Sequence, residues 1–198
     1  MVAIKFLGNI YIILLKIKII LPKLKNNIVL IGPMGSGKTS IGKKLSKLMS
    51  FDFIDTDALI EEKTGVNIST IFDHEGEIGF RERESKILEE IMTCKNTVVG
   101  TGGGIILSEK NREIIIDMGF VVYLTASIKE LVYRTEYDKN RPLISNGNAE
   151  AKITNILKER EEYYENTSNV RITTDNYDTV KLSKIIIKNY EKYAKNNC

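Results

Sequence analysis

Hydrophobic residues from Asn27 onward fall into short runs that alternate with longer amphipathic segments. The short runs are rich in β-branched and aromatic residues, as strands are, and cover residues 28–31, 53–55, 97–100, 120–124 and 170–173. Strands that alternate with helices are typical of a parallel sheet covered on both faces. We therefore predict an α/β fold, a three-layer sandwich with a central parallel sheet of five strands flanked by helices.

The segments between these runs carry apolar residues at helical spacing. We expect core-facing positions at Ile41, Leu45 and Leu48 and, near the C-terminus, at Leu182, Ile185, Ile186, Tyr190 and Tyr193. Ser127, followed three residues later by Glu130, has the capping-box pattern that marks the start of a helix. The polar stretch 136–148 has the composition of a loop, and we expect it to be a mobile lid.

The first 24 residues form an apolar and basic extension outside this pattern. Lys16 and Lys18 interrupt its apolar run, so no stable membrane span is expected, and no small-residue cleavage site follows as in a secretory signal. Three interpretations stay open: a membrane-surface helix, an extra element packed on the domain, or translated sequence upstream of the natural start. The last two are favoured, and residues 25–198 are expected to form one domain.

The composition is that of an ordinary globular protein, with 42% hydrophobic residues, 28% charged residues and a net charge of +3. This charge is too small to indicate a nucleic-acid partner. Cys94 and Cys198 suit neither a metal site nor a disulfide framework, which favours the cytoplasm. His74, the single histidine, is expected at the surface. The small size favours a monomer.

Residues 32–39 read Gly-Pro-Met-Gly-Ser-Gly-Lys-Thr, between a predicted strand and a predicted helix. This spacing and context are those of a P-loop, in which glycines let backbone N–H groups converge on phosphate at a helix N-terminus. The alternative is a glycine-rich turn that binds nothing. We expect a P-loop, with ATP bound by Gly35, Ser36, Gly37, Lys38, Thr39 and Ser40.

The P-loop alone does not identify the phosphate acceptor. The chain has no Asn-Lys-x-Asp motif for guanine and is too short for a motor or a transporter, so a small-molecule kinase is favoured. Asp55 and Asp57 follow a predicted strand, and in an extended chain both would point to one side at its carboxyl edge. Such carboxylates can hold Mg²⁺ through water or orient a hydroxyl, although capping of the next helix is an alternative.

Taken together, five blocks of the sequence resemble the shikimate kinase family. They are the P-loop, Asp55-Thr56-Asp57, Phe80-Arg81, Gly102-Gly103-Gly104 and Arg141-Pro142-Leu143, and the resemblance covers about residues 27–190. It implies transfer of the γ-phosphoryl group of ATP, with Mg²⁺, to the 3-hydroxyl of shikimate. That reaction is a step towards chorismate and the aromatic amino acids.

On the donor side, the resemblance implies that Lys38 and Arg141 are catalytic, with Arg141 in the lid closing over the phosphates. Thr39 and Asp55 would hold Mg²⁺, and Arg134 would stack on adenine. A lid arginine and Lys38 would both stabilise the charge that develops on the phosphoryl group.

On the acceptor side, the resemblance implies that Asp57 takes the proton from the 3-hydroxyl. Arg81 and Arg160 would clamp the carboxylate of shikimate, since planar guanidinium groups bind carboxylates bidentately. Gly103 and Gly104 would offer backbone groups to the ring hydroxyls.

Local pattern alone favours other interpretations for some of these residues. Arg81 could belong to a set of surface ion pairs, Arg160 lies in a run of charges typical of a solvated helix face, and the three glycines could form an ordinary turn. Residues 173–178 depart from the family, which leaves the adenine contacts there open. A gluconate-type kinase and an inactive nucleotide-binding regulatory module stay as alternative functions.

Overall fold

The computed structural model describes residues 26–135, 149–176 and 178–196. The strands are β1 (Asn27–Ile31), β2 (Asp52–Asp55), β3 (Thr97–Gly100), β4 (Gly119–Thr125) and β5 (Val170–Thr173). The helices are α2 (Lys38–Met49), α3 (Thr56–Thr64), α4 (Ile68–Ile91), α5 (Glu109–Met118), α6 (Ile128–Thr135), α7 (Ala149–Thr167) and α8 (Thr179–Asn196), with a 3₁₀ turn η1 (Ile105–Leu107). Every predicted strand is therefore confirmed.

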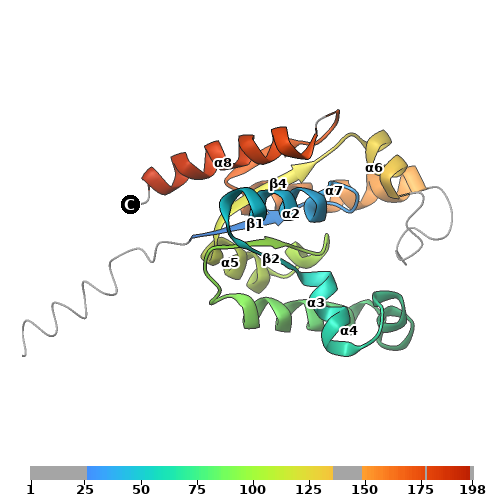
Figure 1. Ribbon diagram of the computed structural model, residues 1–198. Helices are drawn as coiled ribbons and strands as arrows, with labels where there is room; N and C mark the ends of the chain where they lie inside the picture. The colour runs from blue at the N-terminus through green and yellow to red at the C-terminus, as the bar shows by residue number, and fades with distance from the viewer. Residues whose placement is uncertain (1–25, 136–148, 177, 197–198) are drawn as a thin grey trace, which may run out of the picture.

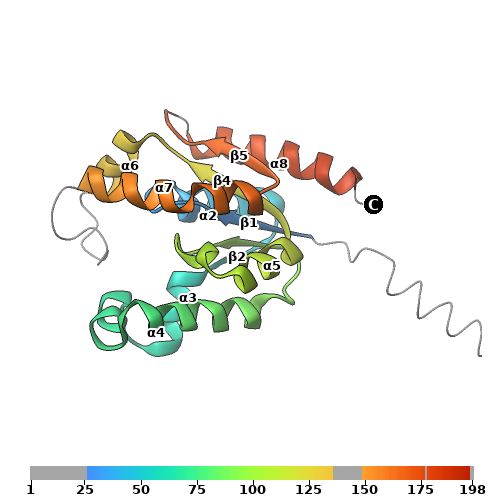
Figure 2. The same ribbon diagram turned by 180° about the vertical axis from the view of Figure 1, so that it is seen from behind.

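The five strands form one parallel sheet in the order β2-β3-β1-β4-β5. Helices α2 and α8 cover one face (Figure 1), and the view from behind shows α5 and α7 in front of the other (Figure 2). β1 is buried on both faces, with Ile28 and Leu30 in the core under α2 and α8 and Val29 and Ile31 in the core of the opposite face. The predicted three-layer α/β sandwich is confirmed.

The parallel register brings the ends of three strands to the same edge of the sheet. Asp55, the last residue of β2, pairs with Gly100, the last residue of β3, and Gly100 pairs with Leu30 of β1. The P-loop, the Asp55–Asp57 segment and the glycine turn 102–104 leave the sheet from these three ends. Ligands of open α/β sheets bind at this edge, so the topology gathers all three segments where a site is expected.

Two of the predicted core positions in helices are wrong. Leu48 is 44% exposed and Ile185 is 40% exposed. In α2 the apolar stripe continues from Leu45 to Met49, one full turn on, which turns Leu48 towards solvent. In α8 the stripe runs through Leu182, Ile186, Tyr190 and Tyr193, and Ile185 lies beside it.

The capping box predicted at Ser127 forms only in part. The Ser127 hydroxyl accepts the N–H of Glu130 at 3.3 Å, as expected for the first residue of the box. The N–H of Ser127, however, is bound by the carboxylate of Asp175 at 3.0 Å. Glu130 instead pairs with Arg134 on the next turn of α6. The acid that completes the cap therefore comes from the loop after β5.

Two expectations fall on residues outside the described parts of the chain: the nature of extension 1–24 and the lid at 136–148. Within residues 26–135, 149–176 and 178–196, no helix is both long and apolar enough to cross a bilayer. His74 is exposed, as expected.

Candidate active site

The P-loop joins β1 to the first residue of α2 and lies against a cavity of about 340 Å³. Gly35 and Gly37 have φ angles of 75° and 89°, a region that favours glycine. Gly37 is the N-cap of α2 and has no side chain to bind the first N–H groups of the helix. Those N–H groups and the positive end of the helix dipole form a site for an anion such as phosphate.

Lys38 and Thr39, the first two residues of α2, both line this cavity. The Lys38 ammonium group donates to the carbonyls of Gly32 and Pro33, at 2.8 Å each. Gly35, Gly37 and Ser40 line the cavity as well, whereas Ser36 is completely buried beneath the loop.

Asp55 makes two kinds of contact, one with each carboxylate oxygen. Its Oδ1 accepts the N–H groups of Asp57 and Ala58, at 3.2 and 3.4 Å, so the capping alternative is realised for this oxygen. Its Oδ2 accepts the Thr39 hydroxyl at 2.7 Å, which brings the two predicted metal-binding residues together.

These two residues fit Mg²⁺ that arrives with a nucleotide. Among the described residues, no group of three or more His, Cys, Asp and Glu side chains could hold a metal. The protein can offer the Thr39 hydroxyl and the Asp55 carboxylate, and Mg²⁺ takes its remaining ligands from phosphate oxygens and water in sites of this kind.

Asp57 lies in the first turn of α3 and not on an extended strand. The prediction that strand geometry aligns Asp55 with Asp57 is therefore wrong, because β2 ends at Asp55. The two carboxylates nevertheless line the same cavity as the P-loop, since α3 begins directly at the end of β2.

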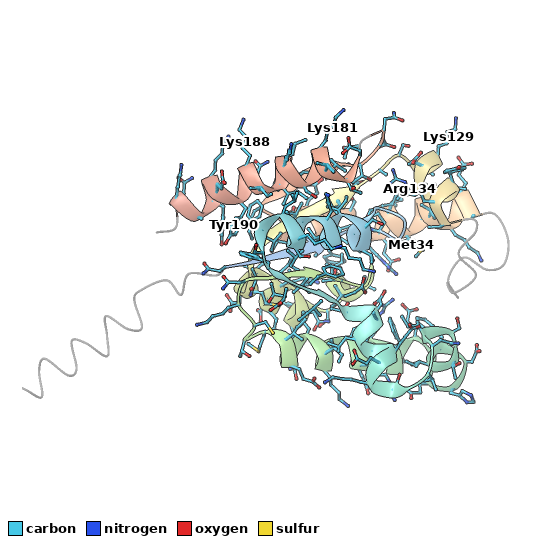
Figure 3. The ribbon with its side chains drawn as sticks, in the orientation of Figure 1. Met34, Lys129, Arg134, Lys181, Lys188 and Tyr190 are labelled. Atoms are coloured by element: carbon cyan, nitrogen blue, oxygen red, sulfur yellow. The ribbon has the colours of Figure 1, made fainter. Side chains whose placement is uncertain are left out.

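Arg134 reaches the P-loop from α6, and Figure 3 shows it beside Met34 of that loop. Its guanidinium donates to the Gly35 carbonyl at 3.2 Å and to the side chain and carbonyl of Thr174 at 2.9 Å each. The arginine thus joins the P-loop to the loop after β5, next to the cavity that it lines. Arg141 lies outside the described residues.

Two of the three glycines in the turn after β3 make room for charged side chains. A Cβ atom on Gly102 would overlap the Glu84 carboxylate and lie 2.7 Å from Oδ1 of Asp57. A Cβ atom on Gly104 would overlap the guanidinium of Arg81. This is more than an ordinary turn, because the absent side chains are replaced by the carboxylates and guanidinium of neighbouring elements.

Arg81 forms ion pairs with Glu77, at 2.8 Å, and with Glu84. The ion-pair interpretation is therefore correct, but Glu84 is completely buried, so the pair is not a surface one. Burial raises the pKa of Glu84 to about 7, although the neighbouring Arg81 opposes the rise. Our sequence reasoning missed Glu84. Its burial could have been inferred from its spacing, because it lies four residues after Phe80 and three before Ile87 in the buried stripe of α4.

Arg160 is only 5% exposed, which contradicts the interpretation as a solvated helix face. The charged residues beside it are exposed, while Arg160 belongs to a buried stripe with Ile153 and Tyr164 at helical spacing. One terminal nitrogen donates to the Gly103 carbonyl at 3.4 Å, and Nε has no hydrogen-bond partner. In the described part of the chain, Arg160 has no ion pair, and the opposite charge that acts on it is that of the nearby Glu84, so α7 presents a buried guanidinium next to the glycine turn.

Comparison with known proteins agrees with this arrangement. The family model described as "Shikimate kinase" matches residues 34–191. The shikimate kinase of Nitrosococcus oceani is 42% identical over 167 residues, which are 84% of this chain and 88% of that protein.

Solved structures give the same picture. A shikimate kinase from Acinetobacter baumannii in complex with shikimate superposes with a TM-score of 0.81 at 42% identity, over 82% of this chain and 91% of that one. A gluconokinase from Sinorhizobium meliloti reaches a TM-score of 0.56 at 16% identity, over 89% and 95% of the two chains, and shares the fold alone. The chain belongs to the shikimate kinase family.

Proposed function

We propose that the protein transfers the γ-phosphoryl group of ATP to the 3-hydroxyl of shikimate. The observation that carries this proposal is the buried guanidinium of Arg160 beside the glycine turn, which forms no ion pair among the described residues and whose Nε has no hydrogen-bond partner. A buried charge without a partner is costly, so its natural complement is an anionic group on the substrate. The carboxylate of shikimate is such a group.

On the donor side, Lys38 and the N–H groups of the P-loop bind the phosphates and stabilise the charge that develops on the transferred group. Thr39 and Asp55 hold Mg²⁺ when it is bound, and the ion neutralises phosphate charge. Arg134 stacks on adenine, beside the loop at Thr174 to which it is anchored. For Arg141, the proposed closure over the phosphates rests on the family resemblance alone.

On the acceptor side, Asp57 accepts the proton of the 3-hydroxyl and is the proposed base. Arg81 and Arg160 bind the carboxylate and so fix the position of the ring. Gly103 lies against the P-loop backbone, because a Cβ atom on it would be 3.4 Å from the Gly32 carbonyl and 3.5 Å from the Met34 nitrogen. Gly103 and Gly104 offer their backbone to the ring hydroxyls.

The product of this reaction continues towards chorismate and the aromatic amino acids. We also propose that the protein acts in the cytoplasm as a monomer, without nucleic acid as a partner. The location, the monomeric state and the absence of a nucleic-acid partner are inferred from composition, size and the family.

A gluconate-type kinase is the first alternative, and the much lower similarity to the gluconokinase weighs against it. An inactive regulatory module is the second, and it is disfavoured because Lys38, Asp55 and Asp57 line one cavity.

The test is ADP release with shikimate, quinate and gluconate as acceptors, with the product identified by mass spectrometry. We expect release with shikimate and a product heavier by one phosphoryl group. Release with gluconate but not shikimate would support the gluconate-type kinase. Release with none of the three would favour the regulatory module.

A further inference from the structure

Tyr164 of α7 is completely buried beneath the glycine turn. Its hydroxyl donates to the carbonyl of Gly103, which also accepts Arg160 at 3.4 Å. Since 3.4 Å is long for a hydrogen bond, the tyrosine is the stronger donor of the two. Two side chains one turn apart on α7 therefore contact the same backbone oxygen.

The Tyr164 ring is held in place by a second aromatic residue. It stacks on Tyr123 of β4, with ring centroids 4.8 Å apart and an angle of 16° between the planes. Burial also raises the pKa of Tyr164, so its hydroxyl keeps the proton that it donates. The hydroxyl is thus a fixed, protonated donor on a ring that is anchored against β4.

The glycine turn is a sensitive place for such an anchor. Gly102 packs on Asp57 and Glu84, Gly104 packs on Arg81, and Gly103 faces the P-loop backbone. A small shift of the turn would therefore move acceptor-binding groups relative to the phosphate donor. Displacements of about 1 Å between reacting groups can cost about 100-fold in rate.

We propose that Tyr164 is a positioning residue of the acceptor site: by binding the Gly103 carbonyl, it fixes the glycine turn and leaves the Arg160 guanidinium to the substrate. Without the hydroxyl, Arg160 becomes the only side-chain donor to that carbonyl among the described residues and is drawn towards it. The inference rests on the proposed function, since shikimate is the anion that Arg160 would bind.

The test is Tyr164→Phe, which removes the hydroxyl and keeps the stacked ring. We expect the KM for shikimate and its Kd by calorimetry to rise about five- to tenfold, as for the loss of one buried hydrogen bond, while the KM for ATP stays within about twofold. The matched control is Tyr123→Phe, which removes a buried hydroxyl from the other ring of the stack and should leave the KM for shikimate unchanged.

Two results would overturn the inference. One is an unchanged KM for shikimate together with a lower melting temperature, which would mean a merely structural role. The other is an equal rise of the KM in both variants. If the unaltered protein does not phosphorylate shikimate at all, the proposed function fails and this inference falls with it.

Discussion

The donor half of the site comes mainly from one short stretch of chain, whereas the acceptor half is collected from four places. Residues 32–40 supply most of the donor half, and Asp55 at the end of β2 and Arg134 of α6 join them. The acceptor half draws on α3, α4, the turn after β3 and α7, between residues 57 and 160. The contrast teaches that this donor site can be recognised from one short stretch of sequence. The residues of the acceptor site come together only after the sheet has formed.

The two halves also differ in the groups they use. The donor half relies on backbone N–H groups, a helix end and the half-buried Lys38, and so needs no fully buried side-chain charge. The acceptor half holds Arg160 and Glu84, both of them buried. Glu84 is paired with Arg81, whereas Arg160 forms no ion pair among the described residues. A buried charge without such a pair lowers stability, so Arg160 indicates a role in binding.

The largest effect is expected from Lys38→Met, which removes the charged side chain of the donor half. We expect kcat to fall by about 1,000-fold or more, because one stabilising donor in a catalytic site is worth about that much. The exposed Lys43→Met on the same helix is the control and should leave kcat unchanged. Unchanged turnover in Lys38→Met would contradict the proposal that the P-loop is the phosphate-donor site.

The second-largest effect is on the free energy of unfolding, and it comes from Glu84 of the acceptor half. The pKa of Glu84 is about 7 in the folded protein against an ordinary value of 4.5, so the folded state holds its proton more tightly. The free energy of unfolding should therefore fall as pH rises from 4.5 to 7, by up to about 3 kcal/mol.

Urea unfolding of the unaltered protein and of Glu84→Gln at pH 5 and pH 7.5 measures this effect, because the variant lacks the titrating group. The exposed Glu82→Gln on the same helix is the control and should keep the pH dependence of the unaltered protein. If Glu84→Gln also keeps that dependence, Glu84 does not have the raised pKa.

The smallest effect is expected from Gly104→Ala. The new methyl group would displace the Arg81 guanidinium, and we expect the KM for shikimate to rise about tenfold with little change in the KM for ATP. Gly100→Ala is the matched control, because its Cβ atom would lie 3.6 Å from Phe53, an ordinary contact. An equal rise of the KM for shikimate in both variants would mean that the rise does not come from displacement of Arg81.

The sequence was sufficient for the sheet and for the position of the P-loop between β1 and α2, because both depend on local pattern. The strand runs and the P-loop spacing needed no knowledge of distant contacts. Asp57 was harder, since its place in the cavity depends on where β2 ends and α3 begins. Its predicted neighbourhood was right, while the strand geometry used to reach it was wrong.

Arg160 and Glu84 show why the acceptor half could not be read from local pattern. Both lie in charged stretches that resemble solvated helix faces, and only the packing of α7 and α4 against the glycine turn buries them. Their helical spacing from apolar neighbours was a signal, but a weak one among so many exposed charges. Family resemblance supplied Arg160, and nothing in our sequence reasoning supplied Glu84.

The central claim is that Arg160 binds the carboxylate of the acceptor, and one comparison tests it most directly. The kcat/KM for shikimate and for its methyl ester, which lacks the negative charge, are measured in the unaltered protein and in Arg160→Met. We predict that the unaltered protein prefers shikimate by about 100-fold and that the variant reduces this preference at least about tenfold. The same preference in both proteins would contradict the claim.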